Sequence, residues 1–566
     1  MRIFTFSLIV SSLFIAGFFQ ANAKVTQYFS TGGEENVQMI STDADGNRYL
    51  IVRFKDTLYV SNQTTPILNP EPGWNALALI KESKSEQLLW SKVIPFEEVP
   101  LFTSLQIGSN SNIYLTSGLR NQMKFAGKTW SNPFSSFAAT VLLRFDANGN
   151  LVWDQFYSSD GGNAFLRAVV EDDDLYLAGH FNGDSLKWEN HSLASGSGIG
   201  TGVIFRYDEM NNELWRTTLN SDTIKYLNPA FVRNNNLTFS ATFSGNQLLI
   251  NNQPGTGLNI TGNAEHPTVA SVNVNSGEYV SGWTATGGRG MWGRAGDFGQ
   301  VLPHPSGGTL LSGVFMDDIT IAGTTINIYN KFYGEQHMVF LDENNDVVWK
   351  RSFADSVNFI PVRADIGSDG TIYLGGNFAK RLQTSGIQET TLAEDAFVLA
   401  LDESNNILGF KRTFTNFFIV ASIDVNTIEA KEDGGVAVGG QFNNITHFGT
   451  DSLINHGYQD GFLWELTMGE LTAIQDYDAT AHFSKTTINV YNVYPNPTTD
   501  RLNVRGLSPN ESYQVKVFSI TGALVMDQNL SHANSIISCS DIPKGTYFLR
   551  LINDRGDMNH IAFVKL

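Results

Sequence analysis

The residues best suited to binding chemistry lie in one glycine-rich segment, residues 284–302, which reads TATGGRGMWGRAGDFGQVL. Arg289 and Arg294 carry planar guanidinium groups that pair with carboxylates or phosphates, and Trp292 offers a stacking surface. Asp297 adds a hydrogen-bond acceptor. Because the chain has few positive charges, this combination predicts a binding site for an anionic or carbohydrate group. The alternative is an ordinary loop that packs over the mouth of its domain.

The same segment contains the spacing GxGxxG at Gly288, Gly290 and Gly293. A dinucleotide site needs this motif between a strand and a helix, because the helix offers its first amides to the pyrophosphate. No βαβ pattern surrounds these glycines, so we interpret the spacing as accidental. The sequence also contains no GxSxG or HExxH motif. An active site assembled from acidic, tyrosine or histidine residues of separate repeats stays open.

Acidic turns at residues 43–47, 171–175 and 342–346 supply oxygen atoms of the kind that Ca²⁺ prefers. None has the complete EF-hand order, and aspartate and asparagine are common in tight turns for their own sake. We therefore expect no cofactor and no metal, with Ca²⁺ as the alternative. Cys539 is the only cysteine, which excludes an internal disulfide and a cysteine-based zinc site. We expect it to be an ordinary strand residue.

An internal repeat must position these residues, and it is the strongest signal in the sequence. Seven times, a polar turn precedes a strand that ends in small residues and one large apolar residue. The strand ends are Phe54, Leu119, Phe181, Phe243, Phe315, Phe378 and Phe442. They lie 62 to 65 residues apart, except for one step of 72 residues that contains residues 284–302.

A second pattern alternates with the first: an apolar strand, a turn rich in aspartate and asparagine, and a strand that opens with tryptophan. This position holds Trp90, Trp153, Trp215, Trp283 and Trp349, with Phe410 in the sixth unit and Trp464 near the last. Stacking of sugars on these rings is one interpretation. A single tryptophan at the same place in each unit is explained more simply by packing between units.

Units of this length with about four strands predict an all-β protein, a seven-bladed β-propeller over residues 24–470. An open β-solenoid is the rival fold. The last unit lacks its final strand, and residues 24–36 supply one, so the ring is expected to close with the two ends of the domain in one blade. The longer connections share one face, which is the expected binding face. These repeats resemble those of bacterial extracellular β-propeller proteins, a resemblance that implies a fold rather than an activity.

The two ends of the chain and its charge bear on location and partners. Arg2 precedes an apolar run, and Ala21 and Ala23 are small residues where a signal peptidase cleaves, so residues 1–23 are predicted to be a signal peptide. A retained membrane anchor is the alternative; no later stretch is long enough to span a membrane. The net charge of −19 argues against a nucleic-acid partner.

The C-terminal region has a different pattern. A polar linker, residues 471–487, precedes alternating strand-like runs in residues 488–566, which predict a small immunoglobulin-like β-sandwich. Its ordered motifs contain Tyr494, Pro495, Asn496, Pro497, Asp500, Gly522, Pro543, Gly545, Tyr547 and Lys565. Together they resemble the C-terminal sorting domain of the type IX secretion system of Gram-negative bacteria.

That resemblance implies a route and a partner. The N-terminal peptide would lead the chain through the Sec pathway to the periplasm, and the type IX machinery would then recognise the sorting domain. The body would be secreted or held at the outer-membrane surface. We expect a monomeric binding or adhesion module whose ligand is a glycan or a protein. A polysaccharide-active hydrolase or lyase is the alternative, and a purely structural surface protein is a third possibility.

Overall fold

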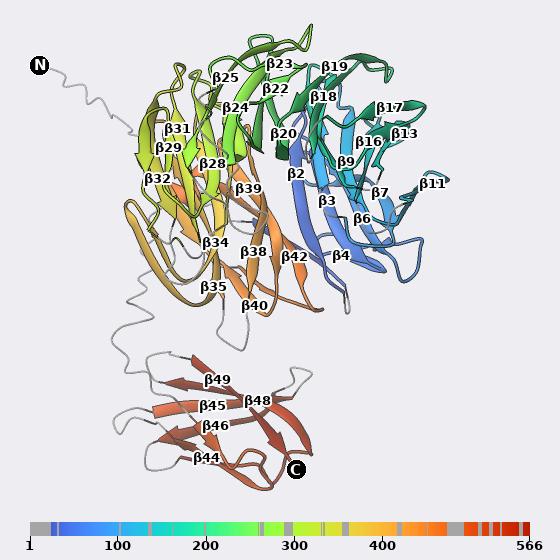
Figure 1. Ribbon diagram of the computed structural model, residues 1–566. Helices are drawn as coiled ribbons and strands as arrows, with labels where there is room; N and C mark the ends of the chain where they lie inside the picture. Colours follow the sequence, from blue (N-terminus) through green and yellow to red (C-terminus); the bar gives the residue numbers. More distant parts are fainter. Residues whose placement is uncertain are drawn as a thin grey trace, which may run out of the picture. The chain divides into compact units, whose positions relative to one another are not determined.

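In the computed structural model the chain forms two units, Met1–Ala473 and Ile474–Leu566 (Figure 1). The described residues are 24–30, 33–100, 103–133, 138–160, 162–196, 200–258, 260, 265–287, 298–329, 331, 334–353, 361–415, 422–449, 451–472, 492–505, 507, 512–519, 524–531, 535–553 and 558–566. Within them the structure consists of antiparallel sheets and one short helix, which confirms the all-β prediction.

The first unit contains seven sheets that each have four main strands in chain order. Sheet 1 consists of β2 (Asn36–Thr42), β3 (Arg48–Lys55), β6 (Asn75–Glu82) and β7 (Leu88–Phe96). Sheet 2 consists of β8 (Thr103–Ile107), β9 (Ile113–Leu119), β12 (Ala139–Phe145) and β13 (Leu151–Ser159). Sheet 3 consists of β14 (Ala164–Glu171), β15 (Asp174–Phe181), β18 (Thr201–Tyr207) and β19 (Glu213–Asn220). Sheet 4 consists of β20 (Thr223–Arg233), β21 (Asn236–Ser244), β24 (Glu265–Asn273) and β25 (Tyr279–Thr284).

The remaining sheets repeat this order. Sheet 5 consists of β27 (Phe298–Pro303), β28 (Thr309–Phe315), β31 (Glu335–Leu341) and β32 (Val347–Phe353). Sheet 6 consists of β33 (Val362–Ile366), β34 (Ile372–Thr384), β35 (Ile387–Leu401) and β36 (Ile407–Arg412). Sheet 7 consists of β38 (Ile423–Ala430), β39 (Gly435–Phe442), β42 (Asp460–Thr467) and β1 (Lys24–Phe29), and α1 (Met468–Thr472) follows β42.

Short hairpins extend several of these sheets. They are β4 (Thr57–Val60) with β5 (Ile67–Leu68), β10 (Gln122–Phe125) with β11 (Lys128–Ser131), β16 (Ser185–Trp188) with β17 (His191–Ala194), and β22 (Leu249–Ile250) with β23 (Gln253–Pro254). Two further hairpins form small sheets, β29 (Ile319–Ile321) and β30 (Thr324–Ile326) with β26 (Thr286–Gly287), and β40 (Ile445–Phe448) and β41 (Asp451–Ile454) with β37 (Phe414–Thr415). Each hairpin belongs to the connection between the second and third strands of a sheet.

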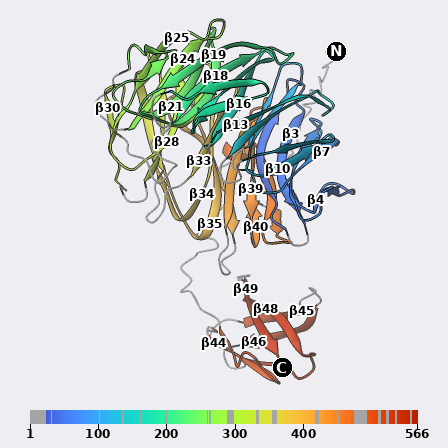
Figure 2. The same cartoon turned by 45° about the vertical axis from the view of Figure 1, so that its right-hand side comes forward.

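Neighbouring sheets of the first unit contact one another. The first strand of each sheet contacts the neighbouring sheet: β2 contacts β8, β8 contacts β14, β20 contacts β15, β27 contacts β21, β33 contacts β28, and β38 contacts β34. Strand β2 of sheet 1 also contacts β38 and β39 of sheet 7. Figures 1 and 2 show the first sheet, in blue, beside the seventh, in orange.

This packing explains why the second strand of each repeat reads as small residues followed by one large apolar residue. Strands β9 and β12 are buried along their whole length, because both faces of a sheet are covered by neighbours. In β15, a Cβ atom on Gly179 would lie 1.8 Å from the carbonyl oxygen of Phe165 on the adjacent strand. Only glycine permits that approach. Phe181 at the strand end is fully buried.

Sheet 7 is completed by the residues expected from the sequence. Strand β1 pairs antiparallel with β42, with Lys24 opposite Glu465 and Tyr28 opposite Gly461. The connection after β1 stays on the same sheet, since the Glu35 amide donates to the carbonyl of Gln459 (3.0 Å). The last sheet therefore contains both the earliest and the latest strands of the unit.

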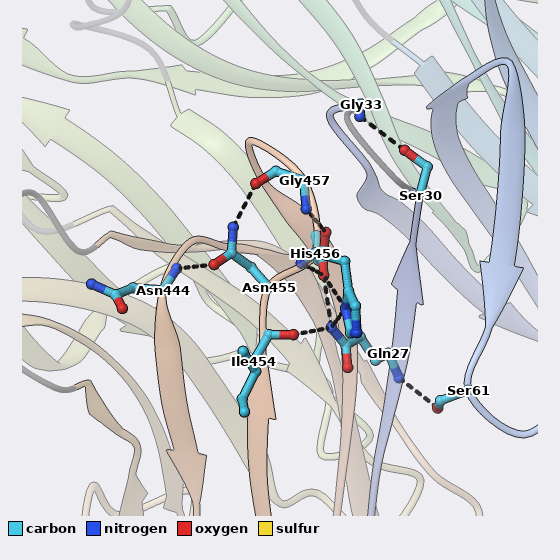
Figure 3. A network of polar contacts seen from close by, with 10 residues as sticks. Gln27, Ser30, Gly33, Ser61, Asn444, Ile454, Asn455, His456 and Gly457 are labelled. Carbon is cyan, nitrogen blue, oxygen red and sulfur yellow. Dashed lines mark hydrogen bonds and ion pairs between the residues drawn. The ribbon is translucent and has the colours of Figure 1, made fainter. Parts of the chain in front are cut away.

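Polar side chains fasten this closing strand (Figure 3). The Gln27 amide donates to the Ile454 carbonyl (2.7 Å) and to the Asp460 carboxylate (2.7 Å), and its backbone amide donates to Ser61 (3.0 Å). Asp460, which is fully buried, also accepts the backbone amide of His456 (2.8 Å). The side chain of β1 thus joins the loop that precedes β42.

The second unit contains two antiparallel sheets around one core. One sheet has the order β43 (Asn492–Tyr494), β44 (Arg501–Arg505), β47 (Ile536–Ser538), and the other has the order β46 (Leu524–Ser531), β45 (Ser512–Ser519), β48 (Gly545–Asn553), β49 (Met558–Lys565). Their core includes Leu502, Val515, Ile537 and Leu549. Cys539 is a buried free thiol in this core, placed just after β47 rather than within a strand.

Candidate functional site

The predicted ligand-binding residues Arg289, Trp292, Arg294 and Asp297 lie outside the described residues, as do the three glycines of the GxGxxG spacing. The same holds for Gly522 and for the predicted cleavage residues Ala21 and Ala23. The segment that carries the ligand-binding prediction is described up to Gly287 and again from Phe298. Both ends belong to the region where sheets 4 and 5 meet.

The recurring tryptophan joins neighbouring sheets. It lies on the fourth strand, and its indole N–H donates to a backbone carbonyl in the turn between the third and fourth strands of the next sheet. The pairs are Trp90 to Ala147 (3.2 Å), Trp153 to Glu209 (3.1 Å), Trp215 to Val274 (2.7 Å) and Trp349 to Glu403 (2.8 Å). These contacts make the tryptophan a packing residue between units, as the simpler interpretation of the sequence held. Trp464 differs, because it lies on the third strand β42 and is fully buried.

A second side chain strengthens three of these joints. It stands two residues after the tryptophan and reaches the same turn of the next sheet. Gln155 donates to Asn211 (2.7 Å), Arg351 donates to Asn405 (2.8 Å), and the Thr217 hydroxyl donates to the Gly277 carbonyl. Each joint is thus fixed by an aromatic ring and a hydrogen-bonding side chain.

Two joints are built differently because the fourth strand of sheet 7 comes from the N-terminal end. The helix α1 takes the place of the usual turn, and a Cβ atom on Gly409 of sheet 6 would lie 2.5 Å from the backbone of Leu471 in that helix. Phe410 occupies the tryptophan position of this joint and has no hydrogen-bond donor. It suits a joint in which α1 replaces the turn that elsewhere accepts the indole N–H. Between sheets 7 and 1, Arg48 bridges Glu82 (2.5 Å) and Glu465 (2.7 Å) instead of a tryptophan.

The joint between sheets 4 and 5 contains a cavity of about 1010 Å³. Trp283 and Glu343, the counterparts of the pairs described above, both line it. The position two residues after Trp283 is Ala285, which is buried and has no polar group to reach the next turn. We call this cavity the inter-sheet groove and define it by Asn236, Ser281 and Trp283 of sheet 4 and Glu343, Asn344 and Asp346 of sheet 5.

The groove takes much of its lining from the short turns. These are the turn after β20, the turn after β27 and residues 342–346. The longer connections, on whose face binding is predicted, also contribute lining residues, among them Thr286, Thr320 and Gly323. Because antiparallel strands place the turns after the first and third strands at the same end, a widened joint opens there.

Arg233, the cation that lines the groove, is already hydrogen-bonded within the protein. Arg233 donates to the carbonyls of His304 (2.9 Å), Gly307 (2.5 Å) and Gly308 (3.1 Å), and so connects sheet 4 to the first turn of sheet 5. Burial lowers the pKa of Arg233 from its usual value. The wall opposite carries the exposed acidic side chains of Glu343 and Asp346.

The acidic turns are shaped by their own amides. The Asp342 carboxylate accepts the backbone amides of Asn344 and Asp346, both at 2.9 Å. Equivalent turns start at Asp146 and Asp402, where burial alone would raise the pKa of the carboxyl, but hydrogen bonds from an asparagine side chain and from backbone amides together outweigh it and lower the pKa. Among the described residues, no group of three or more acidic, histidine or cysteine side chains is arranged to hold a metal.

Sequence reasoning missed a set of buried carboxyl groups on third strands: Glu335 and Asp460 open β31 and β42, and Asp395 lies within β35. Glu335 accepts the amide of Tyr329 (2.9 Å), and Asp395 accepts the amide of Thr415 (2.7 Å). Asp460 plays the same part with His456. These acids organise the loops beside their strands. The signal available in the sequence is an acidic residue that opens an otherwise apolar strand.

Two further carboxyl groups lie on first strands that face one another. Asp365 accepts the amide of Ala430 (2.7 Å), and Glu429 accepts the amide of Thr42 (3.1 Å). Burial raises the pKa of Asp365 to about 6, and burial and the charge of Asp365 raise that of Glu429. Each carboxyl bonds the next sheet in the series, which is a structural role.

In the second unit, the structure brings separate motifs together. The peptide bonds before Pro495 and Pro497 are cis. The Asn496 side chain accepts the backbone amide of Val564 (3.0 Å), and Leu566 donates to the Thr498 carbonyl (2.8 Å). The segment after Tyr494 therefore holds the last residues of the chain.

The other motif residues lie on the neighbouring strands. Gly545 pairs with Lys565 across β48 and β49. The Tyr547 hydroxyl donates to the Pro543 carbonyl (2.8 Å), which closes the turn before β48. The Asp500 carbonyl accepts the amide of Cys539 (2.7 Å). The motifs thus meet around one end of the two sheets.

Residues 492–564 match the family of secretion system C-terminal sorting domains. The chain carries a type IX sorting domain. This domain indicates a protein that is secreted or displayed at the cell surface through the type IX system, and it implies interaction with that machinery. No helix in the described part of the chain has the length and hydropathy needed to span a bilayer.

Comparison of the whole chain adds little. No curated protein matches it. Among solved structures, a protein of unknown function from Dyadobacter fermentans shares 8% identity over 79% of this chain and 100% of its own, with a TM-score of 0.33. Two structures of an extracellular domain from B. thetaiotaomicron, titled as a hybrid two-component and a one-component system, each share 8% identity. They cover 95% and 96% of this chain and 99% of their own, with TM-scores of 0.14 and 0.13. Scores this low establish no shared fold.

Proposed function

We propose that the protein is a seven-bladed β-propeller that is exported through its sorting domain and binds a ligand in the inter-sheet groove. The seven sheets are the blades, and β1 closes the ring by pairing with β42. A signal peptide, residues 1–23, directs the chain to the periplasm by the Sec route. The body follows from residue 24, and after a linker the sorting domain occupies residues 488–566. The mature protein acts as a monomer.

The observation that carries the binding function is the cavity between sheets 4 and 5. Residues of both sheets line this cavity, among them Trp283 of sheet 4 and Glu343 of sheet 5. A widened joint with an aromatic side chain and several polar groups is the arrangement that ligand sites show. The groove is therefore the candidate binding site of this scaffold.

The experiment compares two single substitutions in the mature chain, residues 24–566. Asn344→Ala removes a groove side chain, and Asn148→Ala removes the exposed side chain at the same place in the turn of sheet 2. Both asparagines use only their backbone amide to form the turn, at 2.9 Å from the aspartate, so both variants should fold normally. Retention on a glycan array and on a protein-ligand array is then measured for both variants and the unsubstituted chain.

The proposal expects retention that Asn344→Ala weakens and Asn148→Ala leaves unchanged. Equal retention by all three proteins would place the binding site outside the groove. New reducing ends or unsaturated products during incubation would support the alternative, a polysaccharide-active hydrolase or lyase. No retention on either array would support a structural surface protein.

A further inference from the structure

The groove has the composition of a saccharide site. Trp283 contributes an aromatic ring, and Asn236, Ser281 and Asn344 contribute amide and hydroxyl groups. Sugar rings have apolar faces that stack on aromatic side chains, and their hydroxyl groups need both donors and acceptors. The volume of about 1010 Å³ lies at the upper end of small-molecule sites, roughly 300–1,000 Å³, which leaves room for more than one ring.

The charges in the groove select among saccharides. Glu343 and Asp346 are exposed, and neither carboxylate has a hydrogen-bonding or ionic partner among the side chains of the described residues. Arg233 is already bonded to the carbonyls of His304, Gly307 and Gly308. The lining thus offers free acceptors and no free cation among its described members. A carboxylate or sulfate on the ligand would be repelled, whereas hydroxyl and ammonium hydrogens find acceptors.

We infer that the inter-sheet groove binds a saccharide that carries no anionic group, with a ring on Trp283 and hydroxyl groups donating to Glu343 and Asp346. This inference rests on the proposed binding function and gives it a ligand class. It differs from what residues 284–302 predict, since two arginines favour an anionic group. The acidic lining around Trp283 instead favours a ligand without negative charge.

Isothermal titration of the mature chain with three probes tests the ligand class. The probes are a neutral β-glucan oligosaccharide, a chitosan oligosaccharide and an oligogalacturonate. We expect the unsubstituted protein to bind the neutral or the amine-bearing probe and to give no heat with oligogalacturonate. Trp283→Ala should weaken that binding at least tenfold. The double variant Glu343→Gln, Asp346→Asn should weaken it several-fold and should allow oligogalacturonate to bind.

The controls separate folding from recognition. Glu209→Gln changes the equivalent turn position of sheet 3 and should leave all three titrations unchanged. The urea midpoint of each variant shows whether it folds, and Asn344→Ala replaces Trp283→Ala if the latter unfolds.

Stronger binding of oligogalacturonate by the unsubstituted protein would overturn the ligand class while leaving the groove intact. Saccharide binding that survives Trp283→Ala, Asn344→Ala and the double variant would overturn the groove itself. Retention of protein ligands alone would overturn the assignment to saccharides.

Discussion

Arg48 of sheet 1 and Glu465 of sheet 7 form an ion pair of 2.7 Å in which both side chains are less than one-tenth exposed. Arg48 also pairs with the buried carboxylate of Glu82 at 2.5 Å. Two sheets built from opposite ends of the unit are therefore joined by one guanidinium group. The planar, permanently charged guanidinium suits a position between two carboxylates.

Replacing this cation should open the joint. Arg48→Met leaves Glu82 buried without its partner and leaves Glu465 with only the longer pair to Lys431 (3.4 Å), and the loss of one member of a buried ion pair costs about 3–5 kcal/mol. We expect the free energy of unfolding, measured with urea, to fall by that amount. Arg53→Met on the same strand is the control, because its pair with Glu34 is longer, at 3.5 Å, and Glu34 is half exposed. A similar loss in both variants would contradict the special role of Arg48.

The same joint should weaken in acid. Burial alone would raise the pKa of Glu465, but the charges of Arg48 and Lys431 outweigh it and lower the pKa. A carboxyl with a lowered folded pKa contributes stability above its unfolded pKa, and that contribution is lost as the pH falls through the folded value. Glu465→Gln should therefore narrow the difference in stability between pH 6 and pH 3. A difference as large as that of the unsubstituted protein would contradict the assignment.

Glu35 should show the opposite pH dependence. Burial raises its pKa from 4.5 to about 7, with Asp460 adding to the rise and Ser30 and Arg53 opposing it. A raised folded pKa means that the stability present below pH 4.5 is lost as the pH rises through about 7. Glu35→Gln should therefore stabilise the protein at pH 8 by up to about 3 kcal/mol, by proton linkage, and should change little at pH 4.5. Urea denaturation at both pH values is the measurement, and equal shifts at the two would contradict this prediction.

The helix α1 should be part of the folded body. Its Leu471 is 1% exposed, and Thr467 and Glu470 cap its start through hydrogen bonds of 2.7 Å and 3.3 Å. Leu471→Ala should lower the free energy of unfolding by about 2–5 kcal/mol, as buried leucine truncations do. Leu524→Ala, at an exposed position in the second unit, should have little effect. Calorimetry that resolves the transition of the first unit checks both.

Asn496 should hold the terminal strand of the sorting domain. Asn496→Ala removes the acceptor of the Val564 amide, a bond of 3.0 Å that contributes about 1 kcal/mol. Hydrogen exchange at Val564 should become faster, while exchange in β44 stays unchanged. Asp527→Asn, at an exposed pair with Lys516, is the control and should leave Val564 protected. Unchanged exchange at Val564 in Asn496→Ala would contradict the prediction.

The repeat could be found in the sequence because every unit packs against its neighbours in the same way. Covered faces require continuous apolar runs, close strands require glycine at positions such as 179, and tight turns require aspartate and asparagine. The strand expected at residues 24–36 pairs as predicted, since a missing strand in the last unit is visible as a gap in the pattern. The sorting motifs could also be found in the sequence, because their residue types and their order are visible without a structure.

The groove could not be predicted in the same way. Its lining combines residues of sheets 4 and 5 that are distant in sequence, and neither segment gives a signal alone. The Arg48 bridge and the buried acids of Glu335 and Asp395 also join residues that are distant in sequence. The predicted site at Arg289, Trp292, Arg294 and Asp297 lies outside the described residues, so it stays a prediction.

The pairing of β1 with β42 also sets an order of events in folding. Lys24 meets Glu465 only after every intervening repeat has been made, so this contact has among the largest loop-closure costs in the unit. Proteins dominated by such distant contacts fold slowly. The chain therefore has one incomplete sheet, with two unpaired edges, until β42 has been synthesised.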